Sequence, residues 1–367
     1  MKKILVMLLA AVLFCGCQNK KEEVIQIGAL LSLTGDNAQQ GTLAQNGIML
    51  CVDNINANGG INGKKIELII EDTQTSTKGT LNAFKKIISM HNVQGIVVTG
   101  DTEFQAVNTL ADEYQVPIVA TICTGMLNNN RSKWLFRYCY NEDQEDECMM
   151  NFVKNDLKLS DMALLYPNTL FGQDFYTYSK KYIDINGLNV VADIAYDFNT
   201  TNQKGNALKV IYSKPEIICA RGFGSSLDAL LRYIAELGYS NKIIGDLSIT
   251  TPSTVNNTHG ILEGAYIVAS DLNLYSENAD IKAYVTKYRE LYKKDPCFWD
   301  AIGYDSMLYL CNSLHIGLQS QEGFISAILN NMPTGLLLGD NRFVNSNDVT
   351  FDMHMFTMES GKLIKLQ

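Results

Sequence analysis

The sequence contains few of the residues that metal binding and catalysis commonly use. Histidine occurs four times, as His91, His259, His315 and His354, and these positions do not have the spacing of metal ligands. The phosphate-binding motif GxxxxGK followed by Ser or Thr, the zinc-protease motif HExxH and the hydrolase motif GxSxG are all absent. We therefore expect a protein that has no metal or cofactor and is not an enzyme.

Positive charge is scarce as well. The chain has 30 Lys and Arg against 39 Asp and Glu, which gives a formal net charge of -9 at pH 7. Because nucleic acid binds to basic surfaces, this balance disfavours a nucleic-acid partner. The acid-rich run from Glu142 to Glu147 lies at the expected start of a helix, where acidic side chains interact well with the helix dipole. We expect this run to face solvent rather than to take part in catalysis.

Paired cysteine motifs and proline are also rare. Setting aside Cys15 and Cys17 leaves seven of the nine cysteines, and these are widely spaced, without a CxxC motif. An odd number excludes a complete disulfide framework, although one or two bridges remain possible. Most lie in apolar runs such as EIICARG, which favours buried side chains. Proline occurs only six times and no Pro- or Ser-rich linker is present, which favours short connections between domains.

The first residues have the pattern of a secretory signal. A basic dipeptide precedes an apolar stretch, Ile4 to Phe14, that is too short for a transmembrane helix. The next residues, FCGC, resemble the lipobox of bacterial lipoproteins, with Phe in place of the usual Leu. This resemblance implies a signal peptide over residues 1–16, diacylglycerol on Cys17 and a lipidated tether over residues 17–23. The alternative is an ordinary cleaved signal that leaves a soluble protein.

Apolar, β-branched runs alternate with helix-length amphipathic segments along most of the chain. The first half contains VIQIGALLSL, KIELIIED, VQGIVVTG and VPIVATIC, and the second half contains DMALLYP, NVVADIAY, EIICARGF and KIIGDLS. This alternation with short turns predicts parallel sheets that are covered by helices on both faces. Two such α/β units in series predict two lobes.

The stretch IGALLSLTGDNAQQGTLAQNGIMLCVDNINANGGINGKKIELIIEDTQ resembles the type I periplasmic binding proteins of branched-chain amino-acid ABC transporters. Other similar segments are VPIVATICTG, ALLYPNTLFGQDF, LLRYIAELGY, LEGAYIVAS and FWDAIGYDSMLYL. The resemblance extends over essentially all of Glu23 to Gln367. It implies an α/β fold of two doubly wound parallel-sheet lobes, joined by three crossovers, with a ligand cleft between them. It also implies discontinuous lobes, the first formed by residues 24–140 with 270–338 and the second by residues 141–269 with 339–367.

The resemblance further implies which residues of the first lobe contact the ligand. In the family, a Ser at the start of the third helix binds the ligand carboxylate. That position corresponds here to Asp101 or Thr102, and we favour Thr102 for its hydroxyl. The family's SPxAT turn corresponds to ATICT, which makes the backbone of Ile122, the adjacent Cys123 and the hydroxyl of Thr124 candidates.

The implied contacts of the second lobe are aromatic and acidic. An aromatic residue before Gly corresponds to Phe171, and the aromatic residue after the next strand corresponds to Phe223. The acid that pairs with a ligand ammonium in the family falls one residue from Asp246. In the first loop, Gln40 replaces an aromatic residue, and both Gln40 and Arg221 are weaker candidates for ligand contact.

Each of these residues also has a purely structural interpretation. Asp101 and Thr102 could be helix N-caps, Thr124 could be a turn hydroxyl, and the two Phe side chains could belong to the core. Their shared position after strands favours a ligand role, because open α/β sheets bind ligands at the carboxyl ends of their strands. If Asp101 faces the cleft, it opposes a ligand carboxylate and favours a cation or a hydroxyl-rich ligand.

We therefore predict an extracytoplasmic solute-binding lipoprotein that is lipid-anchored to the bacterial cell envelope. It would capture a small polar metabolite, an amino acid or a derivative, by lobe closure and deliver it to an ABC permease. The alternative is an envelope lipoprotein of the same fold that senses or regulates a partner protein, which a failure to bind any solute would favour. An enzyme that uses the same cleft is the least favoured hypothesis, because the sequence shows no nucleophile–base pair.

Overall fold

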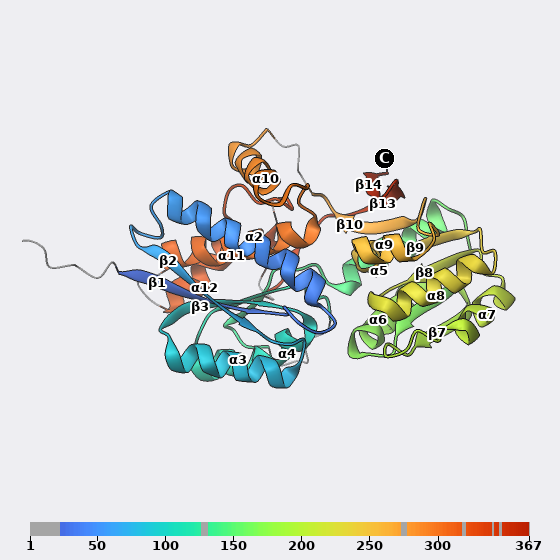
Figure 1. The fold of residues 1–367 in the computed structure, drawn as a ribbon, viewed down its shortest axis with the longest axis horizontal. Helices are drawn as coiled ribbons and strands as arrows, with labels where there is room; N and C mark the ends of the chain where they lie inside the picture. Colours follow the sequence, from blue (N-terminus) through green and yellow to red (C-terminus); the bar gives the residue numbers. More distant parts are fainter. Residues whose placement is uncertain are drawn as a thin grey trace, which may run out of the picture.

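The computed structural model describes residues 23–125, 131–272, 277–317, 321–339, 341–344 and 347–366. These residues form two α/β lobes that lie next to each other along the long axis of the molecule (Figure 1). The expected signal peptide and the expected lipidation site, Cys17, lie outside the described residues.

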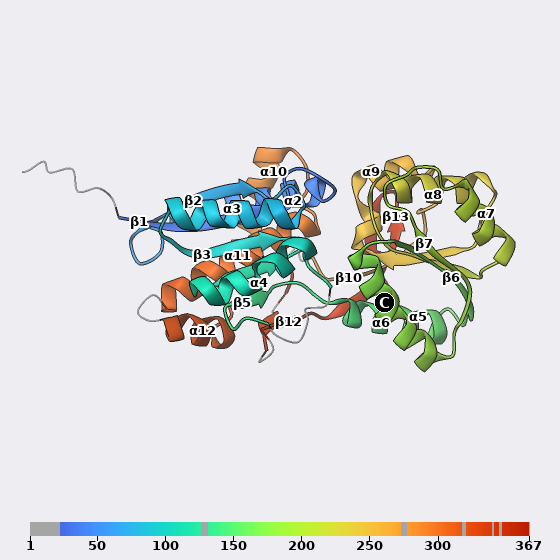
Figure 2. The ribbon, with the colours of Figure 1, turned by 90° about the horizontal axis from the view of Figure 1, so that it is seen from below.

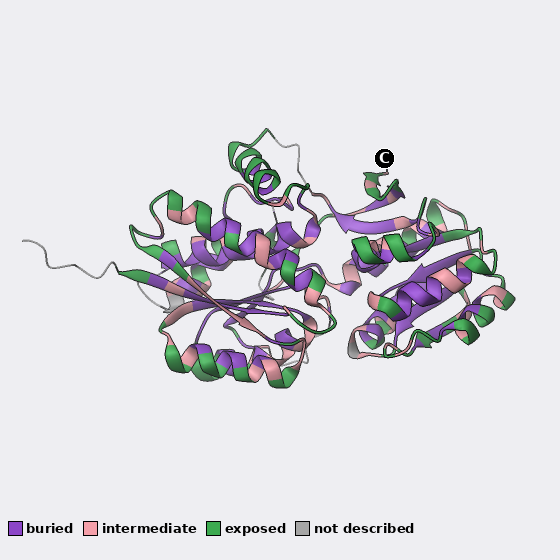
Figure 3. Cartoon of the chain, viewed as in Figure 1, coloured by how far each residue is buried: buried purple, intermediate pink, exposed green. Residues whose placement is uncertain are grey.

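The sheet of the first lobe has five parallel strands in the order β2-β1-β3-β4-β5. The strands are β1 (Val24–Leu31), β2 (Lys65–Asp72), β3 (Val93–Thr99), β4 (Ile118–Thr121) and β5 (Leu135–Arg137). A short antiparallel pair, β11 (Arg342–Phe343) and β12 (Val349–Thr350), lies beside them. All four residues of β4 are buried, which explains why this strand lies in an apolar run. Figure 3 shows that buried residues are concentrated in the sheets and on the inner sides of the helices.

Helices cover both faces of this sheet (Figure 1). On one face α3 packs against α4, and on the other α11 packs against α2 and α12. The helices of this lobe are α2 (Ala38–Ala57), α3 (Thr77–Met90), α4 (Asp101–Tyr114), α10 (Ala279–Tyr292), α11 (Phe298–Gly317) and α12 (Gln321–Asn330). A Cβ on Gly47 would lie 1.9 Å from the carbonyl oxygen of Asp300, and a Cβ on Gly303 would lie 2.4 Å from that of Ala44. Glycine therefore allows α2 and α11 to pack backbone against backbone.

The sheet of the second lobe has seven strands in the order β14-β13-β10-β9-β8-β6-β7. Strands β6 to β10 are parallel, whereas β13 is antiparallel to β10 and forms a hairpin with β14. The strands are β6 (Asp161–Pro167), β7 (Asn189–Tyr196), β8 (Ile217–Ala220), β9 (Lys242–Asp246), β10 (Tyr266–Ser270), β13 (Met353–Glu359) and β14 (Lys362–Lys365).

The helices of the second lobe form two packed groups. Helix α5 contacts α6, whereas α8 contacts both α7 and α9. Their bounds are α5 (Glu142–Asn155), α6 (Leu170–Asn186), α7 (Lys204–Ser213), α8 (Gly224–Glu236) and α9 (Pro252–Asn257), with a short 3-10 helix η1 (Leu247–Thr250) after β9. The two groups lie on opposite faces of the sheet (Figure 2).

The chain passes between the lobes after β5, after β10 and after β12. The last passage differs from the expectation that residues 339–367 belong to the second lobe. Phe343 packs its ring 5.0 Å from that of Tyr309, and Asp348 accepts a 2.7 Å hydrogen bond from the Nε of Arg137. Because both partners belong to the first lobe, β11 and β12 lie there as well (Figure 2), and the passage comes after β12.

The seven described cysteines are all free thiols. Five of them are buried: Cys51, Cys123, Cys139, Cys219 and Cys311. Their burial in the hydrophobic core matches the interpretation of cysteine as a small buried hydrophobic residue.

Candidate ligand-binding cleft

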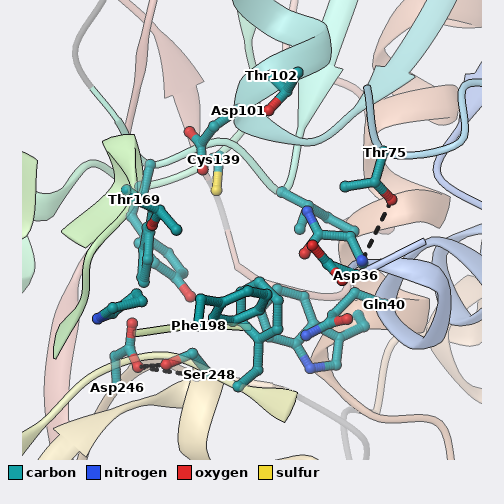
Figure 4. Close-up of a pocket in the computed structure, with 18 residues that line it drawn as sticks. Asp36, Gln40, Thr75, Asp101, Thr102, Cys139, Thr169, Phe198, Asp246 and Ser248 are labelled. Atoms are coloured by element: carbon teal, nitrogen blue, oxygen red, sulfur yellow. Dashed lines mark hydrogen bonds between the residues drawn. The ribbon is translucent and has the colours of Figure 1, made fainter. Parts of the chain in front are cut away.

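A cavity of about 190 Å³ lies between the lobes, and residues of both lobes line it (Figure 4). Each strand from β1 to β9 contributes a lining residue at or shortly after its carboxyl end. This is the edge at which open α/β sheets bind ligands. The predicted ligand-binding residues that line the cavity are Gln40, Asp101, Thr102, Ile122, Thr124, Phe171, Phe223 and Asp246.

The junction between β3 and α4 forms part of the wall from the first lobe. Gly100 has a φ of 106°, and a Cβ there would lie 2.3 Å from Oε2 of Glu103, so this turn requires glycine. The buried Glu103 carboxylate accepts hydrogen bonds from Oγ of Ser32 at 2.8 Å and Oγ1 of Thr73 at 2.6 Å. Glu103 therefore ties the ends of β1 and β2 to α4, and its role is structural.

Asp101 and Thr102 form the first turn of α4 and line the cavity. The N-cap of α4 is Gly100, and no side chain makes a capping hydrogen bond, so the N-cap interpretation of Asp101 and Thr102 is wrong. Oδ1 of Asp101 accepts a 2.8 Å hydrogen bond from the N–H of Gly125. Burial raises the pKa of Asp101 to about 6, although the Gly125 N–H and the nearby Arg137 act in the opposite direction.

Of the three candidate residues in the turn after β4, two line the cavity and one does not. Ile122 has a φ of 55° and lines the cavity, and so does Thr124. Cys123 instead points into the hydrophobic core with 0% exposure and does not line the cavity, so the structure does not support it as a contact. Oγ1 of Thr124 donates a 3.1 Å hydrogen bond to Oε1 of Glu142, a buried carboxyl group in the second lobe.

Three phenylalanine rings form the wall that the second lobe contributes to the cavity. Phe223 lies between Phe171 and Phe198, with ring centroids 6.4 and 5.5 Å away. The first lobe adds Trp299 at the start of α11, and the first passage between the lobes adds Tyr140. The cavity therefore has an apolar, ring-lined side in addition to its polar side.

Asp246 lines the cavity but already has a partner for its charge. Its carboxylate accepts hydrogen bonds from Nη1 of Arg221 and, at 2.9 Å, from the N–H of Ser248 (Figure 4). Arg221 is completely buried and does not line the cavity. Nη1 of Arg221 also lies 2.6 Å from Oε2 of Glu145, and its Nη2 lies 3.5 Å from Oδ1 of Asp146.

The start of α5 thus differs from the expectation of a solvent-facing acidic run. Glu142, Glu145 and Asp146 are buried at 0% exposure, and with Asp246 they form what we call the acid cluster around Arg221. Burial raises the pKa of Glu145 to about 8 and that of Asp146 to about 7, and it raises the pKa of Glu142 well above its usual range. The guanidinium needs these acids because a buried charge without a partner is costly.

Several lining residues were not predicted from the sequence. Phe198 follows β7 and could have been found by the strand-end rule that selected Phe223. Tyr140 follows β5, a strand of only three residues that was not predicted, and Trp299 at the start of α11 reaches the cavity only through tertiary packing. Asp36 also lines the cavity, from the loop after β1.

The described residues contain neither a metal-binding cluster nor a helix that could span a membrane. No group of three or more His, Cys, Asp or Glu residues among them has the geometry to hold a metal ion. None of the described helices combines the length and apolar character needed to cross a membrane.

The chain resembles known proteins over most of its length. A family model described as periplasmic binding protein matches residues 24–362. An amino acid binding protein of Pseudomonas aeruginosa is 24% identical over 243 residues, which is 64% of this chain and 64% of that protein, less than two thirds of its length. The Leu/Ile/Val-binding protein homolog 7 of Brucella suis is 25% identical over 311 residues, covering 80% of this chain and 76% of that protein.

Solved structures share the fold. A leucine-binding protein, LivK, from Thermotoga maritima superposes with a TM-score of 0.84 at 18% identity and covers 94% of this chain and 98% of its own. A branched-chain amino-acid substrate-binding protein, LivJ, from Streptococcus pneumoniae, solved with isoleucine, gives a TM-score of 0.84 at 20% identity and covers 94% and 99%. The predicted α/β fold of two parallel-sheet lobes is therefore confirmed.

Proposed function

The chain belongs to the periplasmic binding protein family, and on that premise we propose that it is an extracytoplasmic lipoprotein that captures a small amino-acid-like solute for an ABC permease. The observation that carries the proposal is the cavity, which both lobes line at the carboxyl ends of their strands. The relatives named for binding amino acids support the solute class.

The proposed mechanism is lobe closure rather than catalysis. Asp101 and Thr124 would contact the ligand from the first lobe, and Phe171 and Phe223 from the second. A ligand that touches both walls binds the closed arrangement better than an open one, so it shifts the population toward closure. The three connections between the lobes would provide the hinge.

Attachment to the envelope would come from a lipid on Cys17. The resemblance of residues 14–17 to a lipobox supports this proposal, and the polar residues 18–23 would act as a tether. A lipid anchor would hold the protein at the membrane surface, close to a permease, without a spanning helix.

Thermal unfolding of the lipid-free chain from Gln18 onward tests the proposed solute class. The protein is first denatured and refolded to remove any solute carried over from the cell, and is then melted with amino acids, amines, small acids and sugars. A ligand that binds only the native state adds about 2.7 kcal/mol of stability at one hundred times its dissociation constant. A shift with amino acids or their derivatives supports the proposal. A shift with none of the panel refutes it and favours the sensor or regulator alternative.

A further inference from the structure

Two polar donors near the β3–α4 junction are bound by carboxyl groups of the protein itself. The N–H of Gly125 donates to Asp101, and the hydroxyl of Thr124 donates to Glu142. The first turn of α4, where an anion would be favoured, carries Asp101 and Glu103. A ligand carboxylate at this position would therefore meet the negative charge of Asp101, and the donors of Gly125 and Thr124 are already used.

The charged side chains that line the cavity are all acidic. They are Asp36, Asp101 and Asp246, and none of the described Lys, Arg or His residues lines the cavity. The nearby Arg137 donates to Asp348 and to the carbonyl oxygen of Gly125, so it is bound elsewhere. Arg221 neutralises Asp246, so the carboxylates that can pair with a ligand cation are those of Asp36 and Asp101.

One polar side chain in the lining makes no hydrogen bond within the described part of the chain. Gln40 is only 4% exposed and lines the cavity, yet its side-chain amide makes no hydrogen bond within the described part of the chain. Because this amide faces the cavity without a partner among the described residues, it can hydrogen-bond a polar ligand group at the first-lobe wall. Its carbonyl oxygen can accept a hydrogen bond from an ammonium group.

Resting on the proposed solute-binding function, we propose that the ligand is an organic ammonium compound without a free carboxylate, such as a decarboxylated amino acid. Its ammonium group would bind at Asp101 and Gln40. Its apolar part would lie against the rings of Phe171, Phe198 and Phe223, which the cavity presents on the opposite wall. The ligand would then differ from an amino acid in lacking the carboxylate.

Matched ligand pairs test this inference by isothermal titration calorimetry on the refolded, lipid-free chain. The pairs are isoamylamine with leucine, phenethylamine with phenylalanine, tyramine with tyrosine, and agmatine with arginine. We expect at least one amine to bind ten or more times more tightly than its parent amino acid. Equal or tighter binding of the amino acids would overturn the ammonium inference and leave the proposed function intact. If no member of any pair binds, both proposals fail.

Charge removal at Asp101 gives a second test of the same idea. Asp101→Asn retains the oxygen that accepts from Gly125, so we expect it to fold and to bind the amine at least tenfold more weakly. Asp53→Asn, on an exposed face of α2 outside the cavity, is the matched control and should leave affinity unchanged. Asp36→Asn, at an exposed lining position, should weaken amine binding by a smaller factor without affecting folding. Unchanged amine binding in Asp101→Asn would refute the inference.

Discussion

Replacing Arg221 by methionine removes the guanidinium that neutralises the acid cluster of the second lobe. Arg221 has 0% exposure and lies within hydrogen-bonding or ion-pair distance of Glu145, Asp146 and Asp246. Breaking a buried ion pair by removing one partner costs about 3–5 kcal/mol. We expect Arg221→Met to reduce the free energy of unfolding by an amount in that range at pH 8.

The loss should be smaller at pH 5.5, because the remaining acids can bind protons. The pKa of Glu145 is raised to about 8 and that of Asp146 to about 7, and Arg221 lowers both, so its removal raises them further. A native state with raised carboxyl pKa values binds more protons than the unfolded chain. Its stability is therefore present at low pH and falls as pH rises through the folded pKa values, by about 1.4 kcal/mol per pH unit for each extra proton.

Urea denaturation at pH 5.5 and pH 8.0 measures this effect. Circular dichroism follows both lobes, whereas tryptophan fluorescence follows the first lobe, which contains Trp134 and Trp299. Arg232→Met is the matched control, because Arg232 is partly exposed and lies 3.7 Å from Glu236, so its loss should cost less than about 1 kcal/mol. A loss for Arg221→Met that is equal at both pH values, or no larger than the control, would refute the reasoning.

Three further changes test packing, anchoring and the aromatic wall. Gly47→Ala should destabilise the protein by about 1–3 kcal/mol in urea denaturation, because its Cβ would lie 1.9 Å from a backbone oxygen of α11. The control Gly205→Ala, in α7 with open space around it, should be neutral or stabilising. Equal effects of the two changes would contradict the close-packing argument. Cys17→Ser should move the full-length protein from the membrane fraction to the soluble fraction, and unchanged fractionation would exclude a lipid on this residue. Phe223→Ala should weaken ligand binding by about tenfold or more in calorimetry, since burying one such side chain is worth about 1.5–3 kcal/mol, and unchanged affinity would remove the aromatic wall from the proposed site.

The α/β architecture could be predicted because its signal is local. Buried parallel strands such as β4 produce unbroken apolar runs, and the helices between them repeat their apolar residues with helical spacing. The position of the last passage between the lobes could not be predicted from the sequence. It depends on Phe343 and Asp348 finding partners in the first lobe, and those partners lie more than thirty residues away in the chain.

The residues that line the cavity could likewise be predicted only in part. Asp101, Thr124 and Phe223 could be placed from the sequence because strand ends of an open α/β sheet converge on one edge. Cys123 could not be excluded, because only the positive φ of Ile122 and the packing of the turn direct its thiol into the core. Tyr140 could not be included because it follows β5, a three-residue strand that was not predicted, and Trp299 could not be included because it begins a helix.

The sequence by itself determined the fold class, the two lobes and the edge at which a ligand would bind, because these follow from periodicity and from the direction of parallel strands. Only the tertiary structure decided the charge of the site. It buried Glu142, Glu145 and Asp146 around Arg221, which the sequence had placed in solvent, and it brought Gly125 to Asp101. The physical reason is that a charged side chain is defined by its neighbours in space: ion pairing and burial join residues that no spacing rule connects.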